Sequence, residues 1–377
     1  MTVLLETWDT PFGLPPFAAI RDEEFGPAFD VALERARAAI AGIAEGPGTS
    51  FAEVVEAMEL AEGDLDRVAG LFYNLASADS NDAREALMRE LALKMSAFSS
   101  EVTNNKALFA KIEALWQGRE GLGLTPEQAR VLQLYRQMFV RSGAALEGAA
   151  AERLTAVKAR LAVLGTAFGQ NLLADERGWF MELSEAEAAR LPGFVQEAAR
   201  AAGAERGLGP VVTLNRSLIV PFLQFSPDRA LRQRAYEAWV ARGANGGDTD
   251  NRAIAAEILA LRAERAQLLG YPDFAAFKLE PEMAGTPQAV RELLMRVWEP
   301  ARGRALADAA VLEAMLRAEG QPLPLEPWDW RYYSEKRRKA DHDLDEAALK
   351  PYLGLEAMLG AMFDCANRLF GLEFREI

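Results

Sequence analysis

The sequence predicts a mainly α-helical protein, and two observations lead to that prediction. Helix-start patterns, in which a hydroxyl residue precedes a proline, recur at Thr125-Pro126, Ser226-Pro227 and Thr286-Pro287. Such a hydroxyl accepts a hydrogen bond from a free helical amide, and proline fits the first helical position because no donor is needed there. Strand patterns are few, and the sequence has no repeat of fixed period. We therefore expect a multi-helix architecture with one small hairpin-like excursion.

Apolar residues repeat with the helical period in the predicted helices. In the clearest one, from about Glu152 to Leu173, they recur every three or four residues, which places on one face the side chains of Leu154, Val157, Leu161, Leu164 and Phe168. A second stripe, from Ile254 to Leu268, is followed by Gly270 and Pro272, a common helix stop. Comparable patterns predict helices at 29–43, 52–77, 83–104, 127–142, 230–242, 289–319 and 355–370.

Two short runs are typical of β-strands. Residues Trp179–Leu183 and Val211–Leu214 are rich in bulky or β-branched side chains, and each run follows a turn-forming glycine or proline. A small serine-capped helix is expected between them. We therefore divide the chain into an N-terminal helical region at 1–175, a small α/β excursion at 176–225 and a second helical region at 226–377.

Composition and charge exclude several classes of function. The chain is 50% hydrophobic and 26% charged, which is the balance of a folded globular protein. Its net charge of −14 argues against a nucleic-acid partner, because phosphate binding needs clustered Lys and Arg. The basic run Lys336–Lys339 is followed by acidic residues, and this pattern is typical of a solvated helix face paired with neighbouring acids.

Neither a membrane span nor a standard secretory signal is recognisable in the sequence. No window approaches the roughly 18 apolar residues of a spanning helix, and Met1–Asp9 lacks the basic start and long apolar run of a signal peptide. We therefore expect a cytoplasmic protein without a membrane partner. The only cysteine, Cys365, excludes an internal disulfide, and its apolar helical context predicts a buried structural thiol.

The single histidine, His342, limits the chemistry of this chain. The His-Glu-x-x-His motif of zinc peptidases needs two histidines one helical turn apart, so this chain does not contain it. We expect His342 to be a surface residue in a polar connector. The alternative, an isolated metal ligand or acid–base group, lacks a second ligand cluster. A calcium loop that begins at Asp341 is excluded, because Glu346 occupies the glycine position and Tyr352 the glutamate position.

The densest unusual feature is the aromatic cluster Pro327–Tyr333. Aromatic side chains with polar groups suit a ligand-binding surface, and on that interpretation the candidate substrate contacts are Trp328, Asp329, Tyr332 and Tyr333. The alternative is a structural elbow after the preceding helix ends at Gly320. Buried aromatic residues are more common than ligand-binding ones, which favours the structural interpretation.

This cluster and the segments around it resemble the peptidyl-dipeptidase and oligopeptidase A family of zinc metallopeptidases, which are similar to thimet oligopeptidase. In the last part of the chain the resemblance lies in Pro327–Trp330, Tyr333–Arg337, Asp343–Glu346, Lys350–Tyr352 and Arg368–Leu372. Earlier in the chain it lies in Phe25–Phe29, Phe139–Ala144, Leu268–Tyr271 and Met283–Pro287. The order and spacing of these segments extend the resemblance over nearly the whole chain.

The resemblance implies an almost entirely helical fold, with two lobes around a deep channel that admits only short peptides. It also implies attack by a zinc-activated water, with the Glu of His-Glu-x-x-His as general base. In the family these residues lie in the second half, and we expect this chain to stop before it. We therefore expect no catalytic residue and no bound metal in this chain, and zinc only in the complete enzyme. The part that remains supplies scaffold and channel wall.

Two hypotheses follow from the sequence. In the first, the chain is the N-terminal half of a peptidase of short peptides, truncated before its catalytic region, and its partner is that missing half, in cis or in trans. Such a half exposes apolar surface, so we also expect self-association. In the alternative, the chain is a stand-alone, non-catalytic helical module that binds peptides or proteins, and its apolar stripes are sealed internally.

Overall fold

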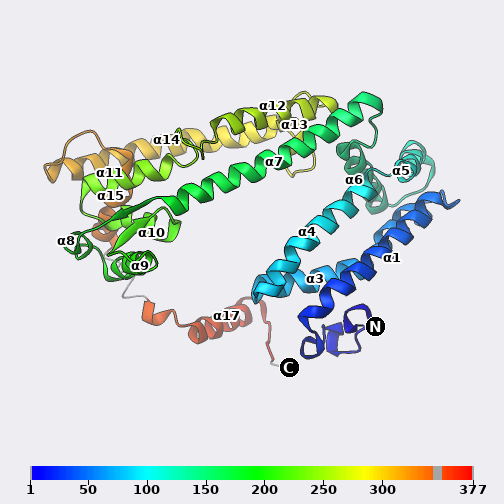
Figure 1. Cartoon of the computed structure of the whole chain (residues 1–377), viewed down its shortest axis with the longest axis horizontal. Helices are drawn as coiled ribbons and strands as arrows, with labels where there is room; N and C mark the ends of the chain where they lie inside the picture. The colour runs from blue at the N-terminus through cyan, green and yellow to red at the C-terminus, as the bar shows by residue number, and fades with distance from the viewer. Residues whose placement is uncertain (1, 343–349, 376–377) are drawn as a thin grey trace. The chain divides into compact units, whose positions relative to one another are not determined.

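The computed structural model describes residues 2–342 and 350–375, which are mostly helical and contain one two-stranded sheet (Figure 1). The predicted fold class, mainly α with a small hairpin near 178–214, is confirmed. The chain forms two compact units. The first unit comprises Met1–Lys158 and Glu264–Pro272, and the second comprises Ala159–Ala263 and Asp273–Ile377. The α/β excursion predicted at 176–225 therefore lies within the second unit.

The first unit is a bundle in which α1 contacts α2, α3, α4 and α5. Its elements are α1 (Phe25–Glu45), a π-helical turn (Ala52–Glu56), α2 (Ala57–Ala61), α3 (Gly63–Ala78), α4 (Asp82–Thr103), α5 (Lys106–Gly118) and α6 (Pro126–Ser142). The start of α7 (Gly148–Gly178) and the end of α12 (Arg252–Leu268) also belong to it. The single helix predicted at 52–77 is wrong in detail, because Glu62, at φ −101° and ψ 6°, separates α2 from α3.

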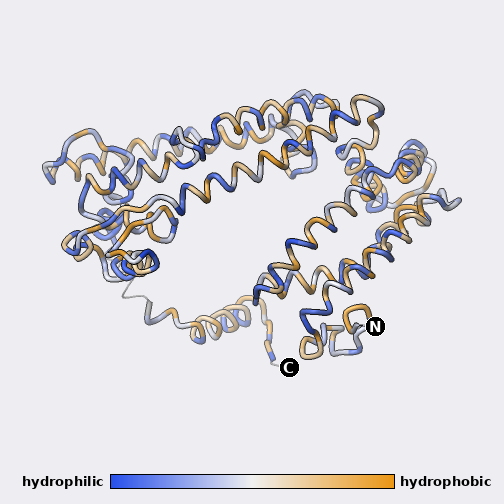
Figure 2. Tube along the Cα trace, viewed as in Figure 1, coloured by the Kyte–Doolittle hydropathy of each residue, from blue (hydrophilic) through white to orange (hydrophobic). Residues whose placement is uncertain are grey.

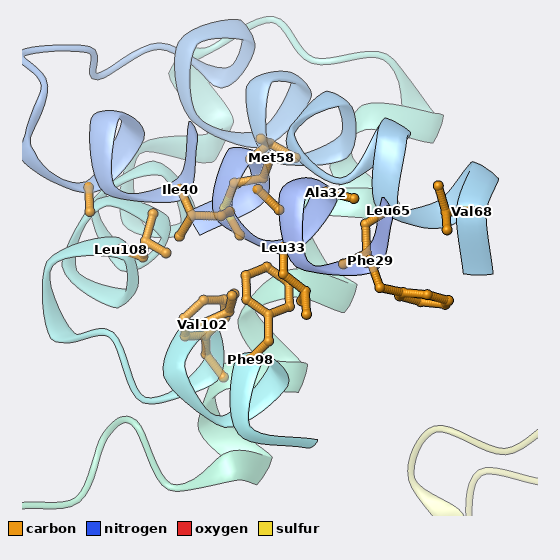
Figure 3. Close-up of a cluster of buried hydrophobic side chains, with 14 of the residues drawn as sticks. Phe29, Ala32, Leu33, Ile40, Met58, Leu65, Val68, Phe98, Val102 and Leu108 are labelled. Carbon is orange, nitrogen blue, oxygen red and sulfur yellow. The ribbon is translucent and has the colours of Figure 1, made fainter. Parts of the chain in front are cut away.

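One face of α1 forms the centre of the first unit's core. Phe29, Leu33 and Ile40 are buried on this face and are packed with side chains of α2, α3, α4 and α5 (Figure 3). The ring of Phe72 lies edge-to-face against Phe25 and Phe29, with centroid distances of 5.2 and 5.7 Å. Full burial of a side chain of this size contributes about 1.5–3 kcal/mol, so packing of the apolar stripe dominates the stability of these helices.

The second unit contains the sheet and the remaining helices. Strand β1 (Phe180–Glu182) pairs antiparallel with β2 (Val211–Thr213), and Phe180 lies opposite Thr213. The helices, besides the remainders of α7 and α12, are α8 (Glu185–Ala188), α9 (Gly193–Ala204), α10 (Arg216–Phe225), α11 (Arg229–Val240), α13 (Phe274–Leu279), α14 (Pro287–Ala318), α15 (Pro327–His342) and α17 (Leu355–Phe370).

A glycine allows α9 to approach the chain that leads into β2. A Cβ atom on Gly203 would stand 1.8 Å from the carbonyl oxygen of Gly209, so no other residue fits there without backbone movement. The close approach lets α9 and α10 pack on β2. The core of this excursion is formed by Met181, Val212 and the apolar faces of those two helices.

Two of the three predicted helix starts are confirmed. The Thr125 hydroxyl accepts from the Gln128 N–H at 3.2 Å and begins α6, and the Thr286 hydroxyl accepts from Ala289 in the same way and begins α14. The third prediction is wrong by two residues. Ser226 ends α10 instead, and the carboxylate of Asp228 accepts from the Leu231 N–H at 3.1 Å to begin α11. A carboxylate satisfies the free amide as well as a hydroxyl does.

The end of α15 agrees with the predicted solvated basic face. Arg337 pairs with Asp308 at 2.7 Å, and Arg338 pairs with Glu335 at 2.6 Å. His342 is exposed, as predicted, but it ends the helix and does not lie in a connector. Most of the acidic segment considered as a calcium loop, including Asp343, Asp345 and Glu346, lies outside the described residues.

The exposed apolar side chains of the second unit are most frequent on α14 and α17. In α14 every residue from 291 to 300 is exposed, and these include Leu294 and Trp298 at 60% and 57%. Helix α17 has no buried residue, and Figure 2 shows it mostly in the colours of hydrophobic residues. The prediction of a buried Cys365 is wrong, because its side chain is exposed on a helix that has no buried residue. No helix in the described part of the chain is both long and apolar enough to span a membrane.

Candidate functional site

The aromatic cluster predicted as a candidate site forms the first turns of α15. Helix α14 ends at Ala318, and Gly320 then takes a left-handed conformation at φ 69°, which only glycine adopts without strain. The Glu326 N–H donates to Asp329 Oδ2 at 3.1 Å, and this local bond helps to define where α15 begins. Helix α15 then packs against α10, α11 and α14.

The carboxylate of Asp329 is the centre of the cluster, and it is fully buried. Arg229 donates to its Oδ2 from Nη2 at 2.6 Å and to its Oδ1 from Nε at 3.0 Å. Arg232 donates to Oδ1 from Nη2 at 2.9 Å. Both carboxylate oxygens are therefore engaged by guanidinium groups from one helix, and the pair formed with Arg229 is bidentate.

The remaining N–H groups of the two arginines bind backbone carbonyls. Arg229 donates to Pro322 O at 2.7 Å, which fixes the loop between α14 and α15. Arg232 donates to Ser226 O at 2.8 Å and to Trp328 O at 3.1 Å. The Arg229–Arg232–Asp329 triad therefore joins the start of α11 to the start of α15.

Burial makes this triad sensitive to the loss of any one member. The side chains of Arg232 and Asp329 are 1% and 0% exposed, and that of Arg229 is 18% exposed. A charge in such a place is tolerated only with an opposite charge and satisfied hydrogen bonds. The triad meets both conditions, so its carboxylate has no free oxygen with which to act as a general base.

The two tyrosines lie beside the triad and differ in exposure. The Tyr332 ring, partly exposed, stacks under Arg232, with the guanidinium carbon 4.2 Å from the ring centroid. The Tyr333 ring is buried, and its hydroxyl donates to Glu319 Oε2 at 3.0 Å. Burial, and then the adjacent Glu319 carboxylate, raise the pKa of the Tyr333 phenol. Glu319 is also paired with Lys336.

Trp328, the first of the two tryptophans in the cluster, is partly exposed. The Trp328 ring lies edge-to-face against Tyr236, with centroids 6.4 Å apart. Its indole Nε1 atom is closed to solvent and finds no hydrogen-bond acceptor among the described residues. The guanidinium carbon of Arg331 lies 5.7 Å from the centroid of the neighbouring Trp239 ring. Aromatic and cationic side chains therefore alternate on this part of the second unit.

The structure brings the four predicted site residues together but gives them different environments. Asp329 and Tyr333 point into the interior, whereas Trp328 and Tyr332 keep some accessible surface. Their assignment to a substrate channel stays a prediction, and the burial of two of them favours the structural interpretation for those two. Arg229 and Arg232 were not predicted from the sequence. Their three-residue spacing at a helix start was visible, but nothing in the sequence linked it to Asp329, about a hundred residues further on.

The described residues do not form a site that suits zinc. No three His, Cys, Asp or Glu side chains in this part of the chain are placed so that they could hold a metal ion. His342 and Cys365, the side chains that zinc favours most, are exposed on α15 and α17, and neither belongs to a group of three such side chains among the residues that the structure describes.

Residues 222–377, which include the buried triad and both tyrosines, match the model of Peptidase family M3. The similarity to such peptidases extends beyond that region. The chain is 33% identical to the dipeptidyl carboxypeptidase of Escherichia coli K12 over 97% of its own length. It is 32% identical to oligopeptidase A of Salmonella typhimurium, again over 97% of its length.

A plant protein, the probable cytosolic oligopeptidase A of Arabidopsis thaliana, is 28% identical over 96% of the chain. These similarities confirm the resemblance predicted from the sequence. The chain covers 54%, 55% and 53% of these three proteins respectively, so it spans about half the length of the curated relatives it matches.

Proposed function

We propose that this chain supplies the scaffold and part of the substrate-channel wall of a zinc-dependent peptidyl-dipeptidase or oligopeptidase that hydrolyses short peptides. The observation that carries the proposal is the similarity to a dipeptidyl carboxypeptidase over 97% of this chain and 54% of that protein. In the proposal, the zinc ligands and the general base come from residues outside this sequence, because the sequence has one histidine.

The exposed apolar helices support this assignment. The α14 face with Leu294 and Trp298 and the whole of α17 leave large hydrophobic side chains in water. Contiguous apolar surface of this kind is typical of protein–protein contacts. In the proposal, the catalytic part of the enzyme covers these faces, in cis or in trans, and the chain self-associates when that part is absent.

The candidate channel residues take two different roles in this proposal. Trp328 and Tyr332 contact peptide, because they retain accessible surface, and Asp329 and Tyr333 hold them in position from the interior. A cytoplasmic location is also part of the proposal. It is supported by one relative that is named as cytosolic, although another is named as organellar.

The experiment is immunoprecipitation of the native protein from its own cells, followed by intact mass spectrometry, zinc analysis and hydrolysis of a short blocked peptide. We expect a zinc-containing, chelator-sensitive peptidase, either as one polypeptide heavier than 41.3 kDa or as a complex with a chain that carries His-Glu-x-x-His. A 41.3 kDa species that is inactive and binds no such chain would support the stand-alone module instead. Stoichiometric zinc and hydrolysis by the purified chain alone would show that it is catalytic by itself.

A further inference from the structure

The first unit contains a cavity of about 290 Å³ between the α2–α3 connection, α4 and α6. Its inner wall is formed by Met58 and Val102, which belong to the buried core shown in Figure 3 and are 4% and 6% exposed. Leu134 and Met138 lie at its mouth, at 42% and 40% exposure. The volume is close to the lower limit of small-ligand sites, roughly 300–1,000 Å³, and suits one side-chain-sized group.

Among the described residues, the polar side chains that line this cavity are three carboxylates and one phenol, and none is a lysine or an arginine. The carboxylates belong to Glu59 on α2, Glu62 between α2 and α3, and Asp66 on α3, and all three line the cavity. Burial, and then the neighbouring Glu59 carboxylate, raise the pKa of the Tyr135 phenol. A cavity with an apolar wall and only negative groups at its rim selects for positive charge on an apolar stem.

The acids from Glu59 to Asp66 differ in whether they line the cavity and in whether they form ion pairs. Asp64, which does not line the cavity, pairs with Arg35 at 2.7 Å and with Arg67 at 2.9 Å. Glu62 and Asp66 line the cavity, and neither forms an ion pair with any residue that the structure describes. Among the acids from Glu59 to Asp66, those that form no ion pair with a described residue are therefore the ones that line the cavity.

Of the three acids that line the cavity, Glu62 has the least favourable environment for a charged carboxylate. Burial, then the charges of Asp66 and Glu59, raise the pKa of its carboxyl group. Its backbone separates α2 from α3, so the helix break directs this acid toward the cavity. A positive group placed there would relieve both the like-charge repulsion and the missing ion pair. The described carboxylates are not arranged to hold a metal ion, which argues against an inorganic occupant.

We propose that this cavity binds an alkylammonium group, with the apolar stem against Met58 and Val102 and the ammonium beside Glu62 and Asp66. The lysine side chain of a peptide and a free alkylamine share this chemistry. The inference concerns the first unit alone and does not depend on the peptidase function proposed above.

The test is isothermal titration calorimetry at pH 7 with N-acetyl-lysine amide and with its uncharged isostere, N-acetyl-norleucine amide. We expect the lysine compound to bind at least tenfold more tightly. Butylammonium chloride distinguishes a free alkylamine from a peptide lysine as the natural ligand. If it binds as tightly as the lysine compound, the site accepts a free amine. If it binds more weakly, the site recognises the lysine side chain of a peptide. Equal affinity for lysine and norleucine compounds, or no binding of any of these probes at 10 mM, would overturn the proposal.

Two variants and a control test whether the lysine compound binds in this cavity. Glu62→Gln should weaken binding of the lysine compound about tenfold, whereas Glu34→Gln, the same change at an exposed position on α1, should leave it unchanged. Leu134→Lys should abolish binding, because it tethers an ammonium at the mouth of the cavity. A thermal scan of each variant shows that it is folded. Binding retained by both Glu62→Gln and Leu134→Lys would place the ligand elsewhere and refute the assignment.

Discussion

The Arg232 guanidinium donates to the Asp329 carboxylate at 2.9 Å, and both side chains are closed to solvent. This contact links residues almost a hundred positions apart and ties the start of α11 to the start of α15. Because water does not screen it, the pair behaves differently from the many ion pairs on the surface of this chain.

Asp329→Asn should be among the most destabilising single substitutions in the second unit. The change keeps the shape of the side chain but leaves Arg229 and Arg232 buried without their counter-charge. Removal of one partner from a buried pair costs about 3–5 kcal/mol. Urea unfolding, followed by circular dichroism and tryptophan fluorescence, measures this loss in the free energy of unfolding.

The matched control is Asp308→Asn, which breaks the half-exposed pairs with Arg304 and Arg337. Surface pairs contribute about 0–1 kcal/mol, so we expect a loss in that range. A similar small loss for both variants would show that the buried triad does not hold the two helices together.

Tyr333→Phe should remove one late-titrating phenol and a buried hydrogen bond. At pH 7 the lost bond to Glu319 should lower the free energy of unfolding by about 1 kcal/mol. The pKa of Tyr333 is raised, so its contribution to stability is present below pH 10 and is lost as the pH rises through the folded value. Alkaline titration at 295 nm should therefore show a smaller high-pH component in this variant, and the remainder should come from Tyr135, whose pKa is also raised by burial and by Glu59. The control Tyr352→Phe, at an exposed ring, should retain that component.

Two glycine-to-alanine substitutions should change the free energy of unfolding in opposite directions. At Gly203 the added Cβ would meet the carbonyl oxygen of Gly209 at 1.8 Å, and we expect a loss of about 1–3 kcal/mol or more as α9 is displaced from β2. At Gly165, inside α7, no atom lies within 4 Å, so alanine should stabilise by up to about 1 kcal/mol. Thermal unfolding monitored at 222 nm measures both. A stable Gly203→Ala protein would contradict the close approach.

Glu62→Gln should stabilise the first unit at neutral pH. Burial and the neighbouring acids raise the pKa of Glu62, so its contribution to stability is present below its unfolded pKa of about 4.3 and is lost as the pH rises through the folded value. Glutamine does not ionise and avoids that loss. The gain in melting temperature over the parent should be seen at pH 7 and should vanish near pH 4. Glu34→Gln should show no such pH dependence, and a gain independent of pH would exclude ionisation as the cause.

Charge placed on the apolar face of α17 should reduce self-association. Met362→Asp and Leu369→Asp replace side chains that are 52% and 68% exposed, so neither should disturb a buried core. We expect a several-fold smaller associated fraction in light scattering, and less binding of a hydrophobic dye. Ala357→Asp, an exposed position on the same helix, is the control for added charge alone. An equal effect of all three variants would show that net charge, and not the apolar face, controls association.

The amino-acid sequence by itself determined the local structure of this protein. Thr125 and Thr286 begin their helices as predicted, and α17 has the predicted bounds. Leu154, Val157 and Leu164 are buried, and their helical spacing in the sequence predicted that they share one face. These features depend on contacts within a few residues, so one segment contains all the information that they need. The resemblance to a peptidase family was also readable from segments in order along the chain.

Only the tertiary structure decided which charges are buried and which faces are covered. Arg229 and Arg232 could not be assigned to Asp329 from spacing, because their pairing depends on how α11 packs against α15. The same reason explains the error at Cys365, since an apolar helical pattern shows that a face can be buried but not whether another element covers it. Burial and ion pairing are properties of the folded chain, and they arise from contacts between segments that the sequence keeps far apart.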